Sequence, residues 1–199
     1  CEKPLAGNLD DAREMYKAAQ KYKKSKTFVW FTYRRCPAVA FAQQLVAQGK
    51  LGKIYHVRAA YLQDWAGPDA PLVWRFRGDI AGSGSHGDLG AHIIDMARFI
   101  TGDEISEIAG AMEHTFIKER PIPESTGGEI SGRNAKTSKT KMGKSTVDDA
   151  VMFLARFKGG ALGSFEATRL STGDKNRNRI EIHGEKGAIR FDFERMNEL

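Results

Sequence analysis

An aspartate and a histidine four residues apart are the strongest chemical signal in this 199-residue sequence. The spacing of apolar residues predicts a helix over residues 88–100. At about 100° per residue, Asp88, His92, Asp95 and Phe99 fall within roughly 60° of one another. A separate stripe of the same helix is apolar, and consists of Leu89, Ile93, Met96 and Ile100. The helix can therefore bury one stripe while it presents two carboxylates and an imidazole.

The pair formed by Asp88 and His92 is suited to proton transfer. At positions i and i+4 the two side chains can hydrogen-bond, which fixes the imidazole tautomer and raises its pKa. A general acid–base that exchanges a proton with a substrate hydroxyl needs such a pair. A simpler interpretation is that Asp88 caps the helix and His92 is a half-buried surface residue, and spacing alone favours it. We expect no metal site, because the other histidines are scattered and no HxxxH or HxH pair accompanies the carboxylates.

A glycine-rich segment directly precedes this helix. Residues 82–87 read GSGSHG, a literal match to the dinucleotide-binding pattern GxGxxG. That pattern functions after a buried parallel strand, where the pyrophosphate meets a helix N-terminus. The run before it, residues 74–80, is interrupted by charges and glycine, and Asp88 would repel a phosphate. We therefore expect no dinucleotide site here, although Asp103 and Glu104 lie near the distance of a ribose partner and keep that alternative open.

Composition narrows the possible classes of protein. The formal net charge is +6, and residues 131–144 carry +5 of it through Arg133, Lys136, Lys139, Lys141 and Lys144. This stretch is polar, contains glycine and lacks apolar periodicity, so we expect a solvated loop rather than a nucleic-acid surface. No apolar run approaches the ~20 residues of a membrane helix. Two cysteines offer neither a disulfide framework nor a CxxC metal pair, which suits a reducing, cytoplasmic location.

The pattern over residues 1–35 is typical of the last part of an α/β domain. Asn8 is a good N-cap for a helix, and residues 27–33 (TFVWFTY) predict a buried strand because they are β-branched and aromatic. Together these elements form the end of a βαβ unit, whose parallel strands need neighbours that these residues do not supply. We therefore expect the sequence to begin partway through a larger domain, and also to stop directly after a strand.

Residues 36–199 predict a second domain of a different kind. A short helix follows Pro37 and stops at Gly49, and Lys158-Gly159-Gly160 is a hairpin signal. Strands are expected over residues 54–64, 105–117, 148–157, 161–170 and, on either side of a Gly184–Gly187 turn, 180–193. The expected fold class is α+β: an open, largely antiparallel sheet with helices on one face, preceded by the βαβ remnant.

Three segments, in order, resemble the glucose–fructose oxidoreductase / inositol dehydrogenase (Gfo/Idh/MocA) family. Glu2-Lys3-Pro4 is similar to the family's EKP motif, and Trp74-Arg75 to its WR pair. Gly87 to Asp95 (GDLGAHIID) resembles its segment with the pattern GxLxDxGxHxxD, although the glycine offset differs. Weaker similarity runs through nearly the whole chain. The family consists of NAD(P)-dependent sugar and cyclitol dehydrogenases.

The resemblance implies roles for particular residues. Lys3, Asp88 and His92 would be the catalytic set: His92 takes the hydroxyl proton, Asp88 orients His92, and Lys3 stabilises charge on the reacting oxygen. Trp74 and Arg75 would approach the cofactor, NAD or NADP, together with Glu2, Lys3 and Pro4. A cis peptide bond is expected before Pro4. The alternatives are a solvent-exposed lysine at a strand end and a tryptophan–arginine pair at the edge of a core.

Substrate contacts are expected from polar or aromatic residues at strand ends: Arg34, Tyr61, Gln63, Trp65, His86 and Arg169. The substrate would be a sugar or polyol. Residues 1–35 would be the remnant of the nucleotide-binding (Rossmann) domain and residues 36–199 the substrate and oligomerisation domain. The main cofactor-binding half would lie outside this sequence, which alone would bind NAD(P) poorly. The uncovered sheet face would form a homo-oligomer. Two rivals remain open: a non-catalytic sugar- or cofactor-sensing relative, and an assembly scaffold.

Overall fold

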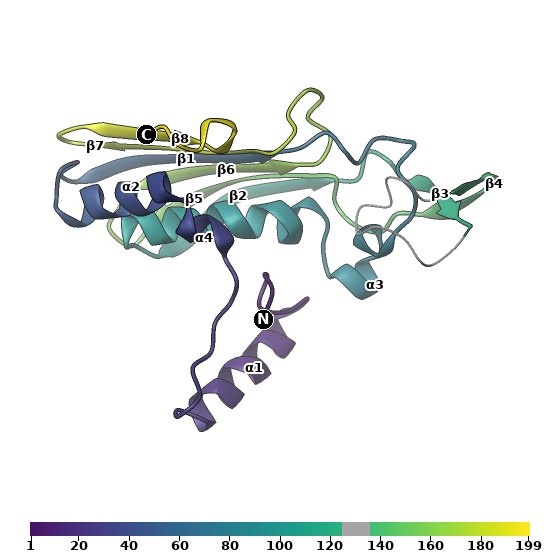
Figure 1. Cartoon of the computed structure of the whole chain (residues 1–199), viewed down its shortest axis with the longest axis horizontal. Coiled ribbons are helices and arrows are strands. Elements are labelled where there is room, and N and C mark those ends of the chain that lie inside the picture. Colours follow the sequence, from purple (N-terminus) through teal and green to yellow (C-terminus); the bar gives the residue numbers. More distant parts are fainter. Residues whose placement is uncertain (125–135) are drawn as a thin grey trace.

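The computed structural model describes residues 1–124 and 136–199, without the side chains of residues 138–140. Its centre is a six-stranded sheet in the order β2-β5-β6-β1-β7-β8 (Figure 1). The strands of this sheet are β1 Ile54–Leu62, β2 Ile105–His114, β5 Ala150–Phe157, β6 Leu162–Thr168, β7 Arg177–Gly184 and β8 Ala188–Asp192. Only β1 and β6 pair in parallel, and all the other neighbours are antiparallel. The predicted α+β class with a largely antiparallel sheet is confirmed.

Two helices cover one face of the sheet. They are α2 (Pro37–Ala47) and α4 (Ala91–Thr101), and both lie along the same side in Figure 1. Period-two burial along the strands turns alternate side chains toward these helices; in β7, for example, Asn178, Ile180 and Ile182 are buried between half-buried neighbours. The main core therefore lies between the helices and this face, and no element within residues 1–124 and 136–199 covers the opposite face.

The start of the chain differs from the expectation in one element. The predicted helix is present as α1 (Leu9–Lys21), and Asn8 caps it by accepting the backbone N–H of Asp11. Residues 27–31, predicted as a strand, have no regular secondary structure, and Thr32–Arg35 form a 3₁₀ turn. A parallel strand needs a neighbour. This segment bonds to the first residue, through Trp30 N to Cys1 O and Cys1 N to Phe28 O, and locally through Phe31, but to no strand among the described residues. The strand prediction is therefore wrong.

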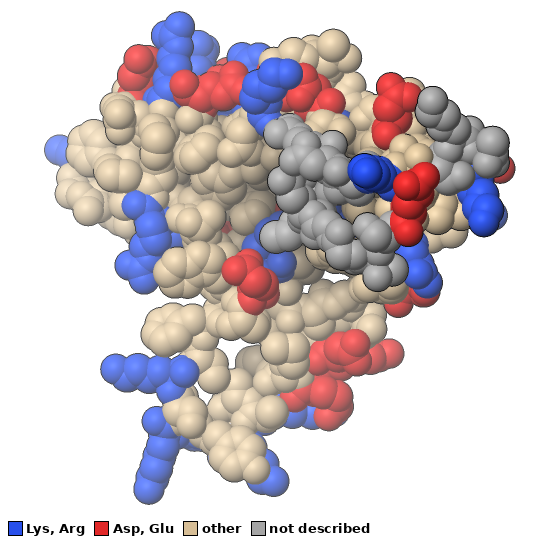
Figure 2. Space-filling model, turned by 45° about the vertical axis from the view of Figure 1, so that its right-hand side comes forward, with Lys and Arg blue, Asp and Glu red and all other residues tan. Residues whose placement is uncertain are grey.

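This N-terminal part lies apart from the sheet. None of residues 1–32 is buried, and α1 sits away from the remaining helices in Figure 1. Figure 2 shows it as a protrusion in the lower part of the view, with acidic and basic side chains at opposite ends. That separation agrees with α1, whose first turn is acidic and whose last turn is basic.

A second, small sheet corrects another expectation. Its strands are β3 (Glu119–Pro123) and β4 (Thr137–Lys144), so most of the segment predicted as a solvated loop is a strand. Residues 131–135 of that prediction lie outside the described residues. The sequence of β4 has no apolar alternation that would predict a strand. The strand pairs with β3, and Gly143 lies so close to the Leu72 side chain that a Cβ there would be 2.5 Å from Leu72 Cδ2. Two short helical segments, the 3₁₀ turn Trp74–Phe76 and α3 (Gly78–Ala81), precede the site.

Candidate functional site

The helix that carries Asp88 and His92 begins with an unusual turn. Residues His86–Gly90 form a single π-helical turn, and α4 continues from Ala91 until Gly102, whose φ of +64° ends it. A π turn holds more residues than an α turn and is frequent at functional sites. Asp88 therefore does not keep the α-helical offset from His92 on which the predicted hydrogen bond depended.

Lys3 meets Asp88 although 85 residues separate them in the sequence. Lys3 Nζ donates to the carbonyl oxygen of Asp88 at 2.5 Å and to its Oδ1 at 3.2 Å. The peptide bond between Lys3 and Pro4 is cis, as predicted. The beginning of the chain and the start of α4 thus converge, as the resemblance requires.

Three cations surround the Asp88 carboxylate. Besides Lys3, Arg75 Nη1 donates to Oδ1 at 2.9 Å, and Arg169 Nη1 lies 3.7 Å from Oδ2. Burial alone would raise the pKa of Asp88, but the positive charges of Arg75, Lys3 and Arg169 outweigh it and hold that pKa below its ordinary value. Asp88 is consequently an anion that fixes Lys3.

His92 lies in an aromatic cage rather than on Asp88. The rings of Tyr33, Tyr61 and Phe31 have centroids 4.9, 5.8 and 6.1 Å from the imidazole. The residue is 8% exposed, and its buried Nδ1 has no hydrogen-bond partner among the described residues. Burial, with a smaller contribution from the charge of Lys3, lowers the pKa of His92 to about 3. The predicted increase in this pKa is wrong, because desolvation by three rings outweighs the attraction of Asp88.

Arg34, predicted as a substrate contact, is paired with Asp95, the second acid of the helix. Its Nε and Nη2 donate to the two carboxylate oxygens of Asp95 at 2.8 and 2.5 Å. The guanidinium also lies over the Phe99 ring, 5.1 Å from its centroid. This bidentate pair ties the 3₁₀ turn that carries Tyr33 to α4. The contacts that the structure shows for Arg34 therefore join two parts of the fold.

Polar side chains near His92 form a hydrogen-bonded group. The Tyr33 and Tyr61 hydroxyls are 2.5 Å apart, and Tyr61 donates to Asn176 Oδ1 at 2.6 Å. Gln63 Nε2 also donates to Asn176 Oδ1, at 2.8 Å, and Trp65 Nε1 donates to Gln63 Oε1 at 2.7 Å. Burial raises the pKa of both tyrosines. The structure thus brings the predicted Tyr61, Gln63 and Trp65 together.

Two members of this group, Tyr33 and Asn176, were absent from the sequence-based candidates. Tyr33 lies in the segment predicted as a strand, where an aromatic residue indicates only burial. Asn176 lies in the turn before β7 and carries no motif. Nothing in the sequence around either residue shows that both meet β1, since those contacts join segments 28 and 115 residues apart.

A cavity of about 470 Å³ opens beside Lys3 and Asp88. Glu2, Pro4, Trp74, Arg75 and Arg169 help to line it. The Trp74 ring is 46% exposed, and the Arg75 guanidinium lies 4.7 Å from its centroid. A flat apolar ring and fixed cations next to an acid can bind a ligand that carries both a planar ring and anionic or polar groups. The residues expected to meet the cofactor therefore share one wall with the acid.

Of the two remaining substrate candidates, Arg169 lines this cavity and His86 does not. Arg169 is 0% exposed and contacts Asp88 and the carbonyl oxygen of Asp148, so its contribution to the site is a buried positive charge. His86 is an exposed residue whose ring packs edge-on against Phe153.

The GSGSHG segment does not form a phosphate-binding loop. Its backbone N–H groups at Gly84 and His86 donate to the carboxylate of Asp148, at 2.6 and 2.9 Å. An anion of the chain itself thus occupies the donors that a pyrophosphate would need. The described residues hold no cluster of three or more His, Cys, Asp or Glu side chains arranged for a metal ion. Within them, no helix is both long and apolar enough to cross a membrane.

Comparison with known proteins agrees with this geometry. The family model for the GFO/IDH/MocA C-terminal domain matches residues 39–190. Levoglucosan dehydrogenase of Pseudarthrobacter phenanthrenivorans is 46% identical over 200 residues, covering 100% of this chain and 50% of that protein. An oxidoreductase domain protein from Kribbella flavida superposes with a TM-score of 0.89 at 53% identity, over 99% of this chain and 50% of that one.

A solved levoglucosan dehydrogenase in complex with NADH and levoglucosan is also similar. It superposes with a TM-score of 0.85 at 43% identity, over 98% of this chain and 48% of that one. The chain therefore spans about half the length of these relatives. Because the matched region covers most of the sequence, this chain belongs to the GFO/IDH/MocA family, through that family's C-terminal domain.

Proposed function

We propose that the protein containing this chain is an NAD(P)-dependent oxidoreductase that interconverts a secondary alcohol and a ketone on a sugar or cyclitol. The contact between Lys3 Nζ and Asp88, within electrostatic range of His92, carries this proposal. The names of its relatives support it, since they include a levoglucosan dehydrogenase and a complex with NADH.

The residues of this chain would handle the proton and the charge on oxygen. The chemistry supplied by NAD(P), when bound, would be hydride transfer to or from the substrate carbon. During oxidation, the hydroxyl proton would pass to His92, which is neutral at neutral pH and so has a free ring nitrogen to accept it. Its Nδ1 is enclosed, so Nε2 is the nitrogen that would meet the substrate. Lys3 donates a hydrogen bond to the reacting oxygen and stabilises its negative charge until the carbonyl forms.

The role of Asp88 differs from the one expected. Its carboxylate and carbonyl oxygens both accept from Lys3, so Asp88 would orient the lysine rather than His92. Arg75 and Arg169 keep Asp88 ionised. Because the carboxylate partly neutralises these cations, it also limits the repulsion that would accompany a positive His92.

Substrate hydroxyls would be recognised by Tyr61, Gln63 and Trp65. The group joined through Asn176 offers hydroxyl and amide donors and acceptors beside His92, which suits a polyol. Glu2, Pro4, Trp74 and Arg75 would hold the nicotinamide end of the cofactor.

We further propose that residues 1–35 belong to a nucleotide-binding domain and residues 36–199 to the substrate domain. The lack of buried residues over 1–32 supports the boundary, because a domain needs its own core. Asp148 occupies the donors of the glycine-rich loop, so this loop offers no site to a pyrophosphate, and the proposed nucleotide-binding domain of the full-length protein would supply that site. Residues 1–199 alone should therefore bind NAD(P) at least roughly tenfold more weakly than the full-length protein. Calorimetric titration of both with NADH and NADPH tests this, and equal affinities would contradict it.

Turnover by the full-length protein is the primary test of the function. Levoglucosan and inositols would be screened with NAD⁺ and NADP⁺ while formation of reduced nicotinamide is followed. His92→Ala should lower kcat by at least roughly 100-fold through loss of general base catalysis. His114→Ala, which removes an exposed histidine of β2, is the matched control. Turnover of His92→Ala within a few-fold of wild type would refute the acid–base assignment. Ligand binding without turnover would indicate a non-catalytic sensing protein. The absence of both binding and turnover would indicate an assembly scaffold.

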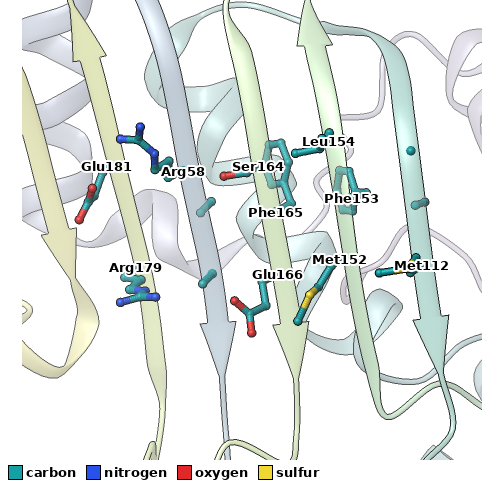
Figure 3. Close-up of a pocket in the computed structure, with 14 residues that line it drawn as sticks. Arg58, Met112, Met152, Phe153, Leu154, Ser164, Phe165, Glu166, Arg179 and Glu181 are labelled. Atoms are coloured by element: carbon teal, nitrogen blue, oxygen red, sulfur yellow. The ribbon is translucent and has the colours of Figure 1, made fainter.

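The uncovered sheet face supports a homo-oligomer. Figure 3 shows Met112, Met152 and Leu154 over β2 and β5, beside Arg58, Arg179, Glu166 and Glu181 over β1, β6 and β7. Two arginines and two glutamates on one face can complement the same face of a second copy across a two-fold axis, with the exposed apolar side chains buried between them. Light scattering should give a multiple of the monomer mass. Leu154→Arg should reduce that mass to the monomer, and an unchanged mass would contradict this interface.

A further inference from the structure

The glycine-rich loop Gly82–Gly87 binds an anion, and that anion is the side chain of Asp148. Oδ1 accepts from the backbone N–H of Gly84 at 2.6 Å. Oδ2 accepts from the hydroxyl of Ser85 at 2.6 Å and from the backbone N–H of His86 at 2.9 Å. Asp148 is only 6% exposed, so these three donors replace the water that a carboxylate would otherwise hold.

The loop and Asp148 also fit each other through the backbone. Ser85 N donates to the carbonyl oxygen of Asp148 at 3.1 Å. A Cβ at Gly84 would lie 1.8 Å from that same oxygen. Glycine at this position is therefore explained by close approach to Asp148, with no bound phosphate required.

Besides its contacts with Lys3 and Arg75, Asp88 has two contacts that depend on this junction. The Asp88 backbone N–H donates to the carbonyl oxygen of Gly84 at 3.0 Å, so the loop holds the backbone of Asp88 in position. The Arg169 guanidinium donates to the carbonyl oxygen of Asp148 at 3.3 Å and lies 3.7 Å from Asp88 Oδ2. The backbone of Asp88 is thus held by the loop and its carboxylate by Arg169, and Asp148 contacts both the loop and Arg169.

We propose that Asp148 is a positioning residue, which locks the Gly82–Gly87 loop and Arg169 so that Asp88 presents Lys3 to the reacting oxygen. This inference rests on the proposed function and adds to it a residue outside the catalytic set. The neighbouring Asp149 has a different environment: it is paired with buried Arg120 at 3.1 Å and accepts from Ile117 N. The carboxylate of Asp149 therefore does not hold the Gly82–Gly87 loop, although the Asp149 carbonyl oxygen accepts from Arg169 N at 3.3 Å.

Asp148→Asn in the full-length protein is the direct test. The amide keeps the shape of the side chain, but its NH₂ must face either Gly84 N or His86 N, so at least one of these bonds is lost. The residue that loses its acceptor, Gly84 or His86, should then exchange its amide proton at least roughly tenfold faster, measured relative to core amides of β5. The kcat should fall roughly 100-fold, as expected for a misplaced catalytic group, while the substrate KM stays within about threefold.

Two further variants separate positioning from general destabilisation. Ile182→Ala removes side-chain volume at a fully buried position of β7, creates a cavity there and controls for lost stability; its kcat below the unfolding transition should match wild type. Ser85→Ala removes one donor to Asp148 and keeps both backbone donors, so a smaller decrease in kcat, roughly tenfold, is expected. It provides the test if Asp148→Asn does not fold.

The inference is overturned if loop exchange is unchanged in Asp148→Asn, or if its loss of kcat is no larger than that of Ile182→Ala. When Asp148→Asn does not fold, wild-type kcat in Ser85→Ala overturns it. Failure of the proposed function has a different signature, since wild-type protein would then turn over no sugar alcohol. In that case faster exchange at Gly84, His86 and Asp88 in the variant would still support locking of the loop, and unchanged exchange would refute it.

Discussion

Stability at mildly acidic pH should report directly on the cage around His92. The ordinary pKa of an unfolded histidine is about 6.5, and in the folded protein this pKa is lowered to about 3. Between these values the unfolded chain binds a proton at His92 that the folded protein does not bind. Stability must therefore decrease as the pH falls through this window, because protons favour the state that takes them up.

The size of this effect follows from the same two values. From pH 7.5 to pH 5, the unfolded imidazole gains nearly its whole proton while the folded imidazole stays neutral, which costs about 2 kcal/mol of unfolding free energy. Asp88 contributes in another range. Its pKa is lowered below 3.8, so the stability it contributes is present above that value and is lost only in stronger acid.

Urea unfolding at pH 7.5 and pH 5 provides the measurement, with the wild type compared with His92→Gln. Glutamine keeps a polar side chain but cannot titrate, so the variant should lose about 2 kcal/mol less than wild type between the two pH values. The remaining histidines are common to both proteins, and their contributions cancel in this difference. His56→Gln, at an exposed position of β1, controls for removal of an imidazole. Equal pH dependence in wild type and His92→Gln would refute the reasoning from desolvation.

Two further predictions concern buried contacts. Arg120→Met should lower the unfolding free energy by about 3–5 kcal/mol, since it leaves the fully buried carboxylate of Asp149 without its cation; chemical denaturation measures this, and a loss below about 1 kcal/mol would contradict it. Gly84→Ala should destabilise by about 1–3 kcal/mol, because its Cβ would lie 1.8 Å from Asp148 O. Gly67→Ala, where a Cβ meets nothing within 4 Å, is the matched control, and equal melting temperatures of the two variants would refute the steric argument.

The sequence predicted elements well where a local pattern defines them. The Lys158-Gly159-Gly160 turn joins β5 to β6, as the hairpin signal indicated. The helix after Pro37 is also present, since its signals lie within one or two turns. The failures at residues 27–33 and in β4 have one cause: a strand exists only where a partner strand lies beside it, and no local pattern names the partner.

The candidate site shows the same division. Short motifs, read through a family resemblance, were enough to nominate Lys3, Asp88 and His92. They did not predict that Asp88 would bind Lys3 in place of His92, because a single π turn changed the angle between the two residues. Asp148 was not nominated, since its three donors lie more than 60 residues away in the sequence.

By itself, then, the sequence determined the order of most elements, the apolar stripe that buries α4, and the residue types able to transfer a proton. Only the tertiary structure decided which acid meets which base, that aromatic rings keep His92 neutral, and that a carboxylate of the chain fills the glycine-rich loop. The physical reason is range. Helix periodicity acts between neighbours along the chain, whereas desolvation and ion pairing act over a few ångströms between segments that only folding brings together.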